Sequence, residues 1–303
     1  MEAAGQLPTD MLVMTTVGKG PKTMERIAII GLGLIGGSLG LALTRQGHPV
    51  VGIARRVETA KAALAMGATT EAGSDLALVA GAEVVFICTP IDAVVATAEA
   101  IAPHLSAGAV VTDVASVKGA IVPAIAALWP DFVGGHPMAG KAEAGLSVAE
   151  AGLFHNRPYV LTPTEATNPA ALERVRAIAE RLGANLCQCH PTQHDRAVAW
   201  ISHLPVMVSS SLILACQQEA DPEILALAQT LASSGFRDTS RVGGGVPDLG
   251  MLMARHNRTA LLDALTQYQH QIEQMKALIE TENWDALHSQ LTQSQAARPD
   301  YLS

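Results

Sequence analysis

The chain has 303 residues, of which 49% are hydrophobic but only 3% aromatic. This length exceeds what a single hydrophobic core usually organises, so we expect two domains, with Ala, Leu, Ile and Val filling the core of an α/β or α-rich fold. Twenty Lys and Arg against 28 Asp and Glu give a net charge of −8, which argues against nucleic acid and anionic membranes as partners and favours a small molecule.

The N-terminal segment and the cysteines indicate where the protein works. Residues 1–23 contain neither the apolar run of a signal peptide nor the Arg-rich, acid-free composition of a transit peptide. We therefore expect a disordered extension at 1–23 and a fold that begins at Met24. The four cysteines are too few for a disulfide framework in a chain of this length, which indicates a reducing cytoplasm.

From Arg26 the chain reads as a strand, a glycine turn, a helix and a second strand. In this context Gly31-x-Gly33-x-x-Gly36 predicts a dinucleotide site, in which the glycines permit a tight turn, close approach of the pyrophosphate and close packing of helix on strand. We expect the phosphates at the helix N-terminus, near the backbone of Leu34 and Ile35. The alternative, a glycine turn that binds nothing, is disfavoured by the flanking strand and helix.

The end of the second strand predicts which dinucleotide is bound. NAD-selective sites keep Asp or Glu about 20 residues after the glycine loop to bind the ribose 2′-hydroxyl. Here the chain reads Gly52-Ile53-Ala54-Arg55-Arg56, without a carboxylate. Arg55 and Arg56 can form charge-assisted hydrogen bonds with a 2′-phosphate, so we predict NADP. The alternative is that both arginines only solvate a loop.

Strand and helix signals alternate up to about residue 190. Continuous apolar runs and Ala-rich helical segments follow one another, and two further short strands flank another helix. The strands are expected at 83–88, 109–112, 158–162 and 185–188, and the helices at 60–66, 93–101, 121–128 and 169–183. This alternation predicts an α/β fold with a Rossmann-type, doubly wound parallel sheet.

Three motifs follow predicted strands at the carboxyl edge of the sheet, where ligands bind in open α/β folds. They are Cys88-Thr89-Pro90, Asp113-Val114-Ala115-Ser116-Val117-Lys118 and Gly134-Gly135-His136-Pro137-Met138-Ala139-Gly140. We expect Thr89 and Pro90 to line the cofactor, and Cys88 to be a small core residue rather than a nucleophile.

His136 is the candidate catalytic base. Removal of hydride from a carbinol requires uptake of the hydroxyl proton, and a histidine beside the nicotinamide is suited to this task. Ser116 is expected next to the cofactor, where it orients His136 or binds the substrate hydroxyl. Taken alone, His136 is equally compatible with a polar loop residue, and its place after a strand of the cofactor domain favours the catalytic role.

The strand signals end near His190 and Pro191. We therefore divide the chain into a dinucleotide-binding domain at 24–190 and an all-α domain at 191–303. Residues 197–216 carry no formal charge and are long enough to span a membrane, but His203 and three consecutive serines within them favour a buried helix at a domain or subunit interface.

The longest predicted helix runs from about Asp248 into the 270s. Its apolar residues are spaced four, three, four, three and four positions apart, at Leu261, Leu265, Tyr268, Ile272, Met275 and Ile279. A seam of this spacing predicts that the helical domain forms a homodimer interface. The alternative is that the seam packs only within its own chain.

Six motifs together resemble the prephenate and arogenate dehydrogenases of tyrosine biosynthesis. They are the glycine loop, DVASVK (113–118), GGHPMAG (134–140), His194-Asp195, SHLP (202–205) and GFRDTSR (235–241), in that order. The resemblance runs from Met24 through the helical domain. It implies an oxidative decarboxylation, in which hydride leaves C4 of a cyclohexadienyl ring for the nicotinamide and loss of the ring carboxylate as CO₂ makes the ring aromatic.

The resemblance also implies three catalytic roles. His136 matches the catalytic histidine, and Ser116 matches its hydrogen-bonded partner. Arg241 matches the clamp for a substrate carboxylate, supplied by the helical domain, and a guanidinium fork suits that task. Asp238 is expected to orient Arg241.

Further substrate contacts are expected at Gly140, His203 and Arg237. For Arg237 a surface role is the alternative. A lone histidine in an apolar stretch, such as His203, is more often a satisfied core residue than a ligand contact.

One departure from the family bears on the substrate. Many prephenate-using members continue SHLP with a second histidine, whereas this chain has Val206. With the Arg55-Arg56 turn, this makes the chain similar to the cyanobacterial arogenate dehydrogenases, so we predict L-arogenate as substrate and L-tyrosine as product and competitive inhibitor. The alternative is a prephenate dehydrogenase, or a cyclohexadienyl dehydrogenase that accepts both substrates.

Two other interpretations are disfavoured. A non-catalytic NADP-dependent sensor or scaffold would have no need of Ser116, His136 and Arg241 together. A zinc site at Cys187, Cys189, His190 and His194 has suitable ligand types but atypical spacing, so we expect no metal.

Overall fold

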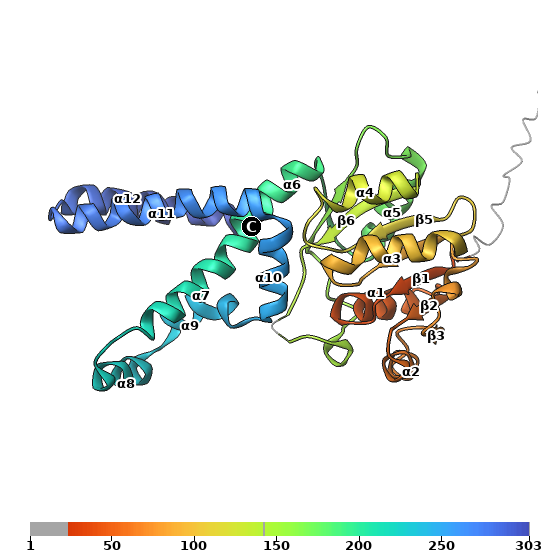
Figure 1. The fold of residues 1–303 in the computed structure, drawn as a ribbon, viewed down its shortest axis with the longest axis horizontal. Helices are drawn as coiled ribbons and strands as arrows, with labels where there is room; N and C mark the ends of the chain where they lie inside the picture. Colours follow the sequence, from red (N-terminus) through yellow and green to blue (C-terminus); the bar gives the residue numbers. More distant parts are fainter. Residues whose placement is uncertain (1–23, 142, 303) are drawn as a thin grey trace, which may run out of the picture.

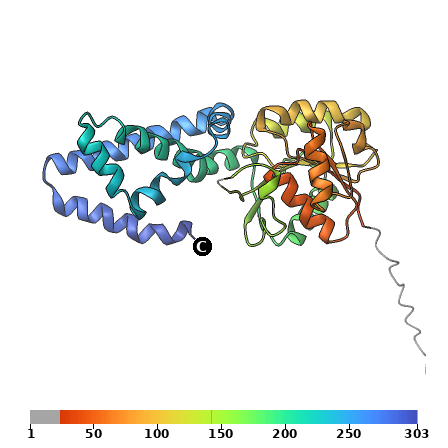
Figure 2. The same ribbon diagram turned by 90° about the horizontal axis from the view of Figure 1, so that it is seen from below.

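The structure is a computed structural model that describes residues 24–141 and 143–302; the extension predicted at 1–23 lies outside these residues. Figure 1 shows an α/β lobe that holds the strands and a lobe built only of helices, joined through α6 (Pro191–Val198). In the perpendicular view of Figure 2 the two lobes again lie end to end. The predicted α/β and all-α parts of the chain are therefore separate lobes.

The α/β lobe contains one eight-stranded sheet with the order β3-β2-β1-β4-β5-β6-β7-β8. The strands are β1 (Ile27–Ile30), β2 (Val50–Ile53), β3 (Glu71–Gly73), β4 (Val84–Ile87), β5 (Val110–Asp113), β6 (Phe132–Pro137), β7 (Pro158–Thr162) and β8 (Asn185–Gln188). The first six follow the doubly wound dinucleotide-binding order, whose crevice opens between β1 and β4. The predicted doubly wound parallel sheet is confirmed, and the one antiparallel pairing among the described strands is that of β7 with β6.

Helices cover both faces of this sheet, as a doubly wound fold requires. They are α1 (Leu34–Arg45), α2 (Val57–Ala65), α3 (Val94–Ile101), α4 (Ile121–Leu128) and α5 (Pro169–Arg181). The apolar sides of α1 and α5 pack on one face with Ile27, Ile29 and Phe86. Those of α3 and α4 pack on the other face with Ile30 and Ile87. The central strands β1, β2, β4 and β5 are buried on both faces, which explains why they read as continuous apolar runs.

The helical lobe begins with α6, continues through a π-helix, η5 (Ala199–His203), and enters α7 (Leu204–Cys216). This stretch, Pro191–Cys216, is long and apolar enough to cross a membrane, with a mean hydropathy of 1.6 over its most apolar window. His194 and His203 within it are nevertheless buried, and both bond to other elements of the protein. The stretch thus forms the connection between the lobes.

The remaining helices are α8 (Pro222–Leu231), α9 (Ser234–Ser240), a 3₁₀ turn η6 (Arg241–Gly244), α10 (Pro247–His256), α11 (Arg258–Glu280) and α12 (Trp284–Ala297). The prediction of one helix from Asp248 into the 270s was wrong, because the helix is interrupted at Asn257, which separates α10 from α11. Leu252 and Met253 of α10 pack on the core of the α/β lobe. Along the predicted seam of α11, Leu261 is buried, whereas Ile272 and Ile279 are 44% and 52% exposed.

Candidate active site

The glycine loop between β1 and α1 has the shape that a dinucleotide requires. Gly31 has a φ of +97°, and a Cβ at Gly36 would lie only 1.9 Å from the carbonyl oxygen of Gly31. A Cβ at Gly33, in contrast, would meet nothing within 4 Å. The first and third glycines are needed for the loop itself, and the second leaves open space beside the helix N-terminus.

That open space suits a pyrophosphate. Gly33 caps α1 without any side-chain hydrogen bond, and the first turn of α1 contains no acidic residue. The first backbone N–H groups of a helix, here those of Leu34, Ile35 and Gly36, lack intrahelical partners and lie at the positive end of the helix dipole. The loop therefore fits the diphosphate of a dinucleotide.

The other cofactor candidates surround the same crevice. Arg55 and Arg56 follow β2 directly; both are exposed, and within residues 24–141 and 143–302 neither forms an ion pair. Thr89 and Pro90 follow β4 beside the loop, where the carbonyl of Cys88 would contact a Cβ on Gly31 at 2.5 Å. Burial raises the pKa of the Cys88 thiol, which disfavours the nucleophilic thiolate.

His136 lies within β6 rather than in the turn predicted after it. It is opposite Val160 of β7 in the antiparallel ladder, and the residue is only 7% exposed. Burial, together with the nearby His194, Lys118 and His203, lowers the pKa of His136 well below 6.5. A neutral imidazole is the form that can accept a proton, so this environment suits a base.

The partner of His136 also differs from the prediction. His136 Nδ1 lies 2.8 Å from His194 Nε2, and the two rings meet edge to face with centroids 5.0 Å apart. Ser116 Oγ is buried without a hydrogen-bond partner among the described residues. The expected bond between Ser116 and His136 is thus replaced by one to His194, and the Ser116 hydroxyl remains available for a ligand.

A buried ion pair fixes the strand that carries His136. Lys118 Nζ pairs with the Asp113 carboxylate, and both side chains are 0% exposed. Lys118 Nζ also donates to Gly135 O at 2.8 Å, and Asp113 accepts from the backbone N–H groups of Ala115 and Gly135. The DVASVK motif therefore joins the end of β5 to the residue next to His136.

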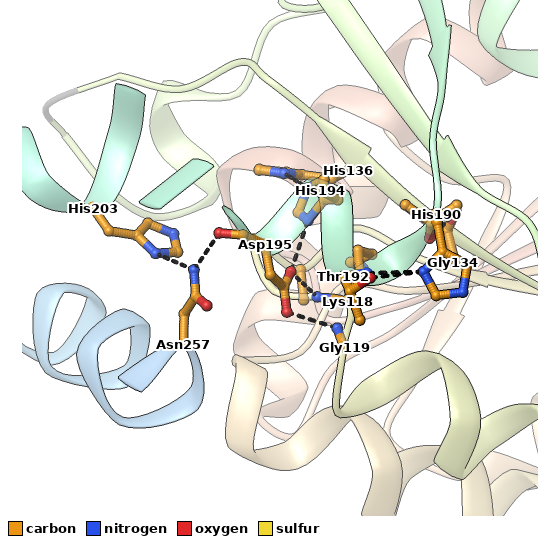
Figure 3. Close-up of polar contacts among 12 residues, drawn as sticks. Lys118, Gly119, Gly134, His136, His190, Thr192, His194, Asp195, His203 and Asn257 are labelled. Carbon is orange, nitrogen blue, oxygen red and sulfur yellow. Dashed lines mark hydrogen bonds and ion pairs between the residues drawn. The ribbon is translucent and has the colours of Figure 1, made fainter. Parts of the chain in front are cut away.

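Asp195 of α6 connects the two lobes at this point (Figure 3). Its carboxylate accepts hydrogen bonds from the backbone N–H groups of Lys118 and Gly119, each at 2.7 Å, and lies 2.8 Å from His194 Nδ1. His194 and Asp195 were visible in the sequence as a motif, but the sequence did not indicate what they touch. Their contacts join residues 58 to 77 positions apart.

His203 and Asn257 extend this network into the helical lobe (Figure 3). Asn257 Nδ2 donates to Asp195 O at 2.7 Å, which fixes the amide orientation, and lies 3.1 Å from His203 Nδ1. His203 Nδ1 is therefore an acceptor, and its proton must lie on Nε2. Burial lowers the pKa of His203 to about 4, and within the described chain Nε2 is buried without a partner. The N–H group at His203 Nε2 is therefore available to donate a hydrogen bond to a ligand.

The remaining candidates lie on the surface. Arg241, in η6, and Arg237, in α9, are both exposed. Asp238 was expected to orient Arg241, but in the structure its carboxylate forms an ion pair with Arg237 at 3.1 Å. Gly140, just after β6, is also exposed, and a Cβ there would meet nothing within 4 Å.

Val206 of α7 lies where the helical lobe packs on the α/β lobe. A Cβ on Gly250 of α10 would lie 3.5 Å from its Cγ1. Val206 also lies against the core cluster that contains Leu252 and Met253. Val206 is thus an apolar packing residue. Among the described residues no group of three or more His, Cys, Asp and Glu side chains is placed to hold a metal ion.

A glycine loop that fits a diphosphate and a buried, neutral histidine at the same sheet edge define a dinucleotide-dependent dehydrogenase. The family profiles described as the nucleotide-binding domain and the dimerization domain of prephenate dehydrogenase match residues 39–188 and 190–293. The chain belongs to the prephenate dehydrogenase family.

Relatives within this family differ in the substrate that their names give. The chain is 51% identical to Synechocystis arogenate dehydrogenase, with a TM-score of 0.82 over 91% of this chain and 99% of that one. It is 26% identical to Aquifex aeolicus prephenate dehydrogenase, solved with hydroxyphenyl propionate and NAD+, with a TM-score of 0.86 over 92% and 98% of the two chains. It is 30% identical to Zymomonas mobilis cyclohexadienyl dehydrogenase over 90% of this chain and 95% of that one.

Proposed function

We propose that the chain catalyses the oxidative decarboxylation of L-arogenate to L-tyrosine and CO₂ with reduction of NADP. The observation that carries the proposal is the placement of His136, buried and neutral at the sheet edge that the glycine loop shares. The 51% identity to Synechocystis arogenate dehydrogenase supports the choice of substrate.

Each side chain has a defined task in this reaction. Bound NADP supplies the acceptor for the hydride that leaves C4 of the ring. His136 takes the proton of the C4 hydroxyl as the carbonyl forms, and Ser116 Oγ is free to hold that oxygen. When the ring carboxylate leaves as CO₂, its bonding electrons pass through the ring to this oxygen. His136 then returns the proton to the phenolate, so the reaction releases no net proton.

The preference for NADP rests on Arg55 and Arg56. Both are exposed beyond β2, and neither is neutralised by an ion pair within residues 24–141 and 143–302. Ala54 follows the end of the strand, so no carboxylate is present there to repel a 2′-phosphate. Two unpaired guanidiniums at this position are suited to bidentate phosphate binding.

The helical lobe supports assembly as a homodimer, and the small number of cysteines favours a cytoplasmic protein. Apolar side chains on α7, α8 and α11 are left exposed by the single chain, among them Leu214 at 58%, Leu231 at 69% and Ile279 at 52%. Exposed apolar patches of this kind are typical of subunit interfaces. Arg241 lies in the same lobe, where we propose that it binds a substrate carboxylate, with Arg237, His203 and Gly140 as further contacts.

A crossed assay tests the proposal. The purified chain is incubated with L-arogenate or prephenate and with NADP or NAD, and reduced cofactor is followed by absorbance, with L-tyrosine added in a second series. We expect turnover with arogenate and NADP, and inhibition by tyrosine that more arogenate relieves. Turnover of prephenate would instead support the second candidate, a prephenate or cyclohexadienyl dehydrogenase, which the Aquifex and Zymomonas relatives favour. No turnover in any combination would contradict the enzyme assignment and favour an NADP-binding sensor.

A further inference from the structure

We propose that His194 and Asp195 are positioning residues that fix the proton of His136 on Nδ1 and so leave Nε2 as the base. This inference rests on the proposed function for its catalytic meaning, but the proton position itself is a property of the free protein. It concerns the chain of contacts that runs from the carboxylate of Asp195 through His194 to His136 (Figure 3).

The direction of these hydrogen bonds starts at Asp195. An ionised carboxylate can only accept, and this one already accepts from the backbone N–H groups of Lys118 and Gly119 at 2.7 Å. The group 2.8 Å away, His194 Nδ1, must therefore donate. A neutral imidazole carries a single proton, so His194 Nε2 is left as an acceptor.

The same logic transfers to His136. His194 Nε2 lies 2.8 Å from His136 Nδ1, so His136 Nδ1 must carry the proton in that bond. The lone pair of a neutral His136 then lies on Nε2. A carboxylate that sets the tautomer of a catalytic histidine is a known device in Ser-His-Asp sites, where it acts directly. Here a second imidazole stands between the two groups.

The surroundings of the two imidazoles favour the proton of His136 on Nδ1 over the proton on Nε2. His194 is 2% exposed and His136 is 7% exposed, so water does not compete for their ring nitrogens. The other charged or titratable groups around His136 are Lys118, which is paired with Asp113, and His203, which donates toward no described residue. Asp195 is the carboxylate that contacts this pair, and it does so through His194 Nδ1. Because α6 supplies His194 and Asp195 and β6 supplies His136, the base is fixed only when the two lobes are joined.

The test reads the tautomer directly. The full chain is labelled with ¹⁵N-histidine, and two-bond ¹H–¹⁵N spectra are recorded without substrate at pH 7.5, with the His136 signals assigned by their loss in His136→Asn. We expect the Nδ1–H tautomer in the wild type. His194→Leu should shift His136 toward the Nε2–H form that free imidazole prefers, and should lower kcat about 10- to 100-fold with little change in the KM for NADP.

Two further variants isolate the hydrogen bond. His194→Gln keeps an acceptor near the position of Nε2, so it should retain the Nδ1–H tautomer and most of kcat. His104→Leu, an exposed histidine on a distant turn, should change neither. An Nε2–H tautomer of His136 in the wild type would overturn the proposal without any variant, and so would an unchanged tautomer in His194→Leu. Because the spectra need no substrate, they decide the proposal even if the crossed assay shows no turnover.

Discussion

Lys118 and Asp113 form an ion pair that is entirely removed from solvent, at the junction between β5 and the strand that carries His136. Burial lowers the pKa of Lys118, and the neighbouring Asp113 opposes this effect. Two charges inside a protein are tolerable only while each has its partner, because a lone buried charge has lost its hydration without compensation. The pair therefore couples the stability of the α/β lobe to the position of the base.

Replacing Lys118 by Met should remove about 3–5 kcal/mol from the free energy of unfolding, because it leaves the Asp113 charge buried and unpaired. Urea unfolding of the wild type and the variant at one protein concentration measures this loss. The matched control is Lys141→Met, which breaks an ion pair with Glu150 whose side chains are 29% and 51% exposed. That control should cost at most about 1 kcal/mol. Equal losses in both variants would contradict the importance of burial.

The glycine loop offers two substitutions with opposite signatures. In Gly33→Ala the new Cβ has open space in the free protein, so the unfolding free energy should change by less than about 1 kcal/mol. The same methyl group occupies the space for the pyrophosphate, so the Kd for NADP should rise at least about tenfold, which equals about 1.4 kcal/mol. Calorimetric titration of the variant with NADP measures the change.

Gly36→Ala is the comparison. Its Cβ would lie 1.9 Å from Gly31 O, so the loop has to move even without cofactor. We expect a loss of about 1–3 kcal/mol in the unfolding free energy in addition to weakened NADP binding. If Gly33→Ala bound NADP as tightly as the wild type does, the diphosphate would have to lie elsewhere.

The parts of the fold with local signals could be predicted from the sequence. The strand from Ile27 could be predicted because it is a continuous apolar run. The glycine loop could be predicted because its spaced glycines, between a strand and a helix, are typical of a dinucleotide-binding turn. The sequence predicts a turn at Gly134-Gly135-His136-Pro137 because these residues have little β propensity of their own, whereas in the structure they form part of β6 and pair with β7. The break at Asn257 was missed because Asn is tolerated in helices and its bonds go to residues far away in sequence.

The candidate site divides in the same way. His136 and Ser116 could be selected because they follow strands of a recognisable cofactor domain. The roles of His194, Asp195 and Lys118 could not, since each depends on a contact between segments that the sequence does not place together. A polar pair such as His194-Asp195 looks the same in a sequence whether it faces solvent or holds a base.

The cofactor preference is tested by Arg55→Ala combined with Arg56→Ala. Loss of two charge-assisted contacts with the 2′-phosphate should lower kcat/KM for NADP by about 10- to 100-fold or more, and should leave kcat/KM for NAD within about threefold. Arg176→Ala removes a single exposed arginine on α5 and is the control for loss of a positive charge away from the cofactor site. An unchanged ratio of NADP to NAD activity in the double variant would mean that both arginines only solvate their loop.

The network around His203 should make stability depend on pH. The folded-state pKa of His203 is about 4, against 6.5 in the unfolded chain. Between pH 6.5 and pH 4 this residue is protonated in the unfolded state but not in the folded state. Its contribution to the free energy of unfolding is therefore fully present above pH 6.5 and is lost as the pH falls toward 4. This one group should account for a loss of up to about 3 kcal/mol.

The variant His203→Asn isolates this contribution, because Asn can still accept a hydrogen bond from Asn257 but does not titrate. At pH 7.5 the variant should be less stable than the wild type, since it packs less well. The difference should narrow as the pH falls to 4.5, because only in the wild type is the unfolded state stabilised by protonation of this residue, which lowers the free energy of unfolding. Urea midpoints at pH 7.5, 5.5 and 4.5 measure the difference, with His104→Asn as the exposed control, which should follow the wild type. Parallel curves for His203→Asn and the wild type would show that His203 accepts a proton in the folded protein as readily as in the unfolded chain.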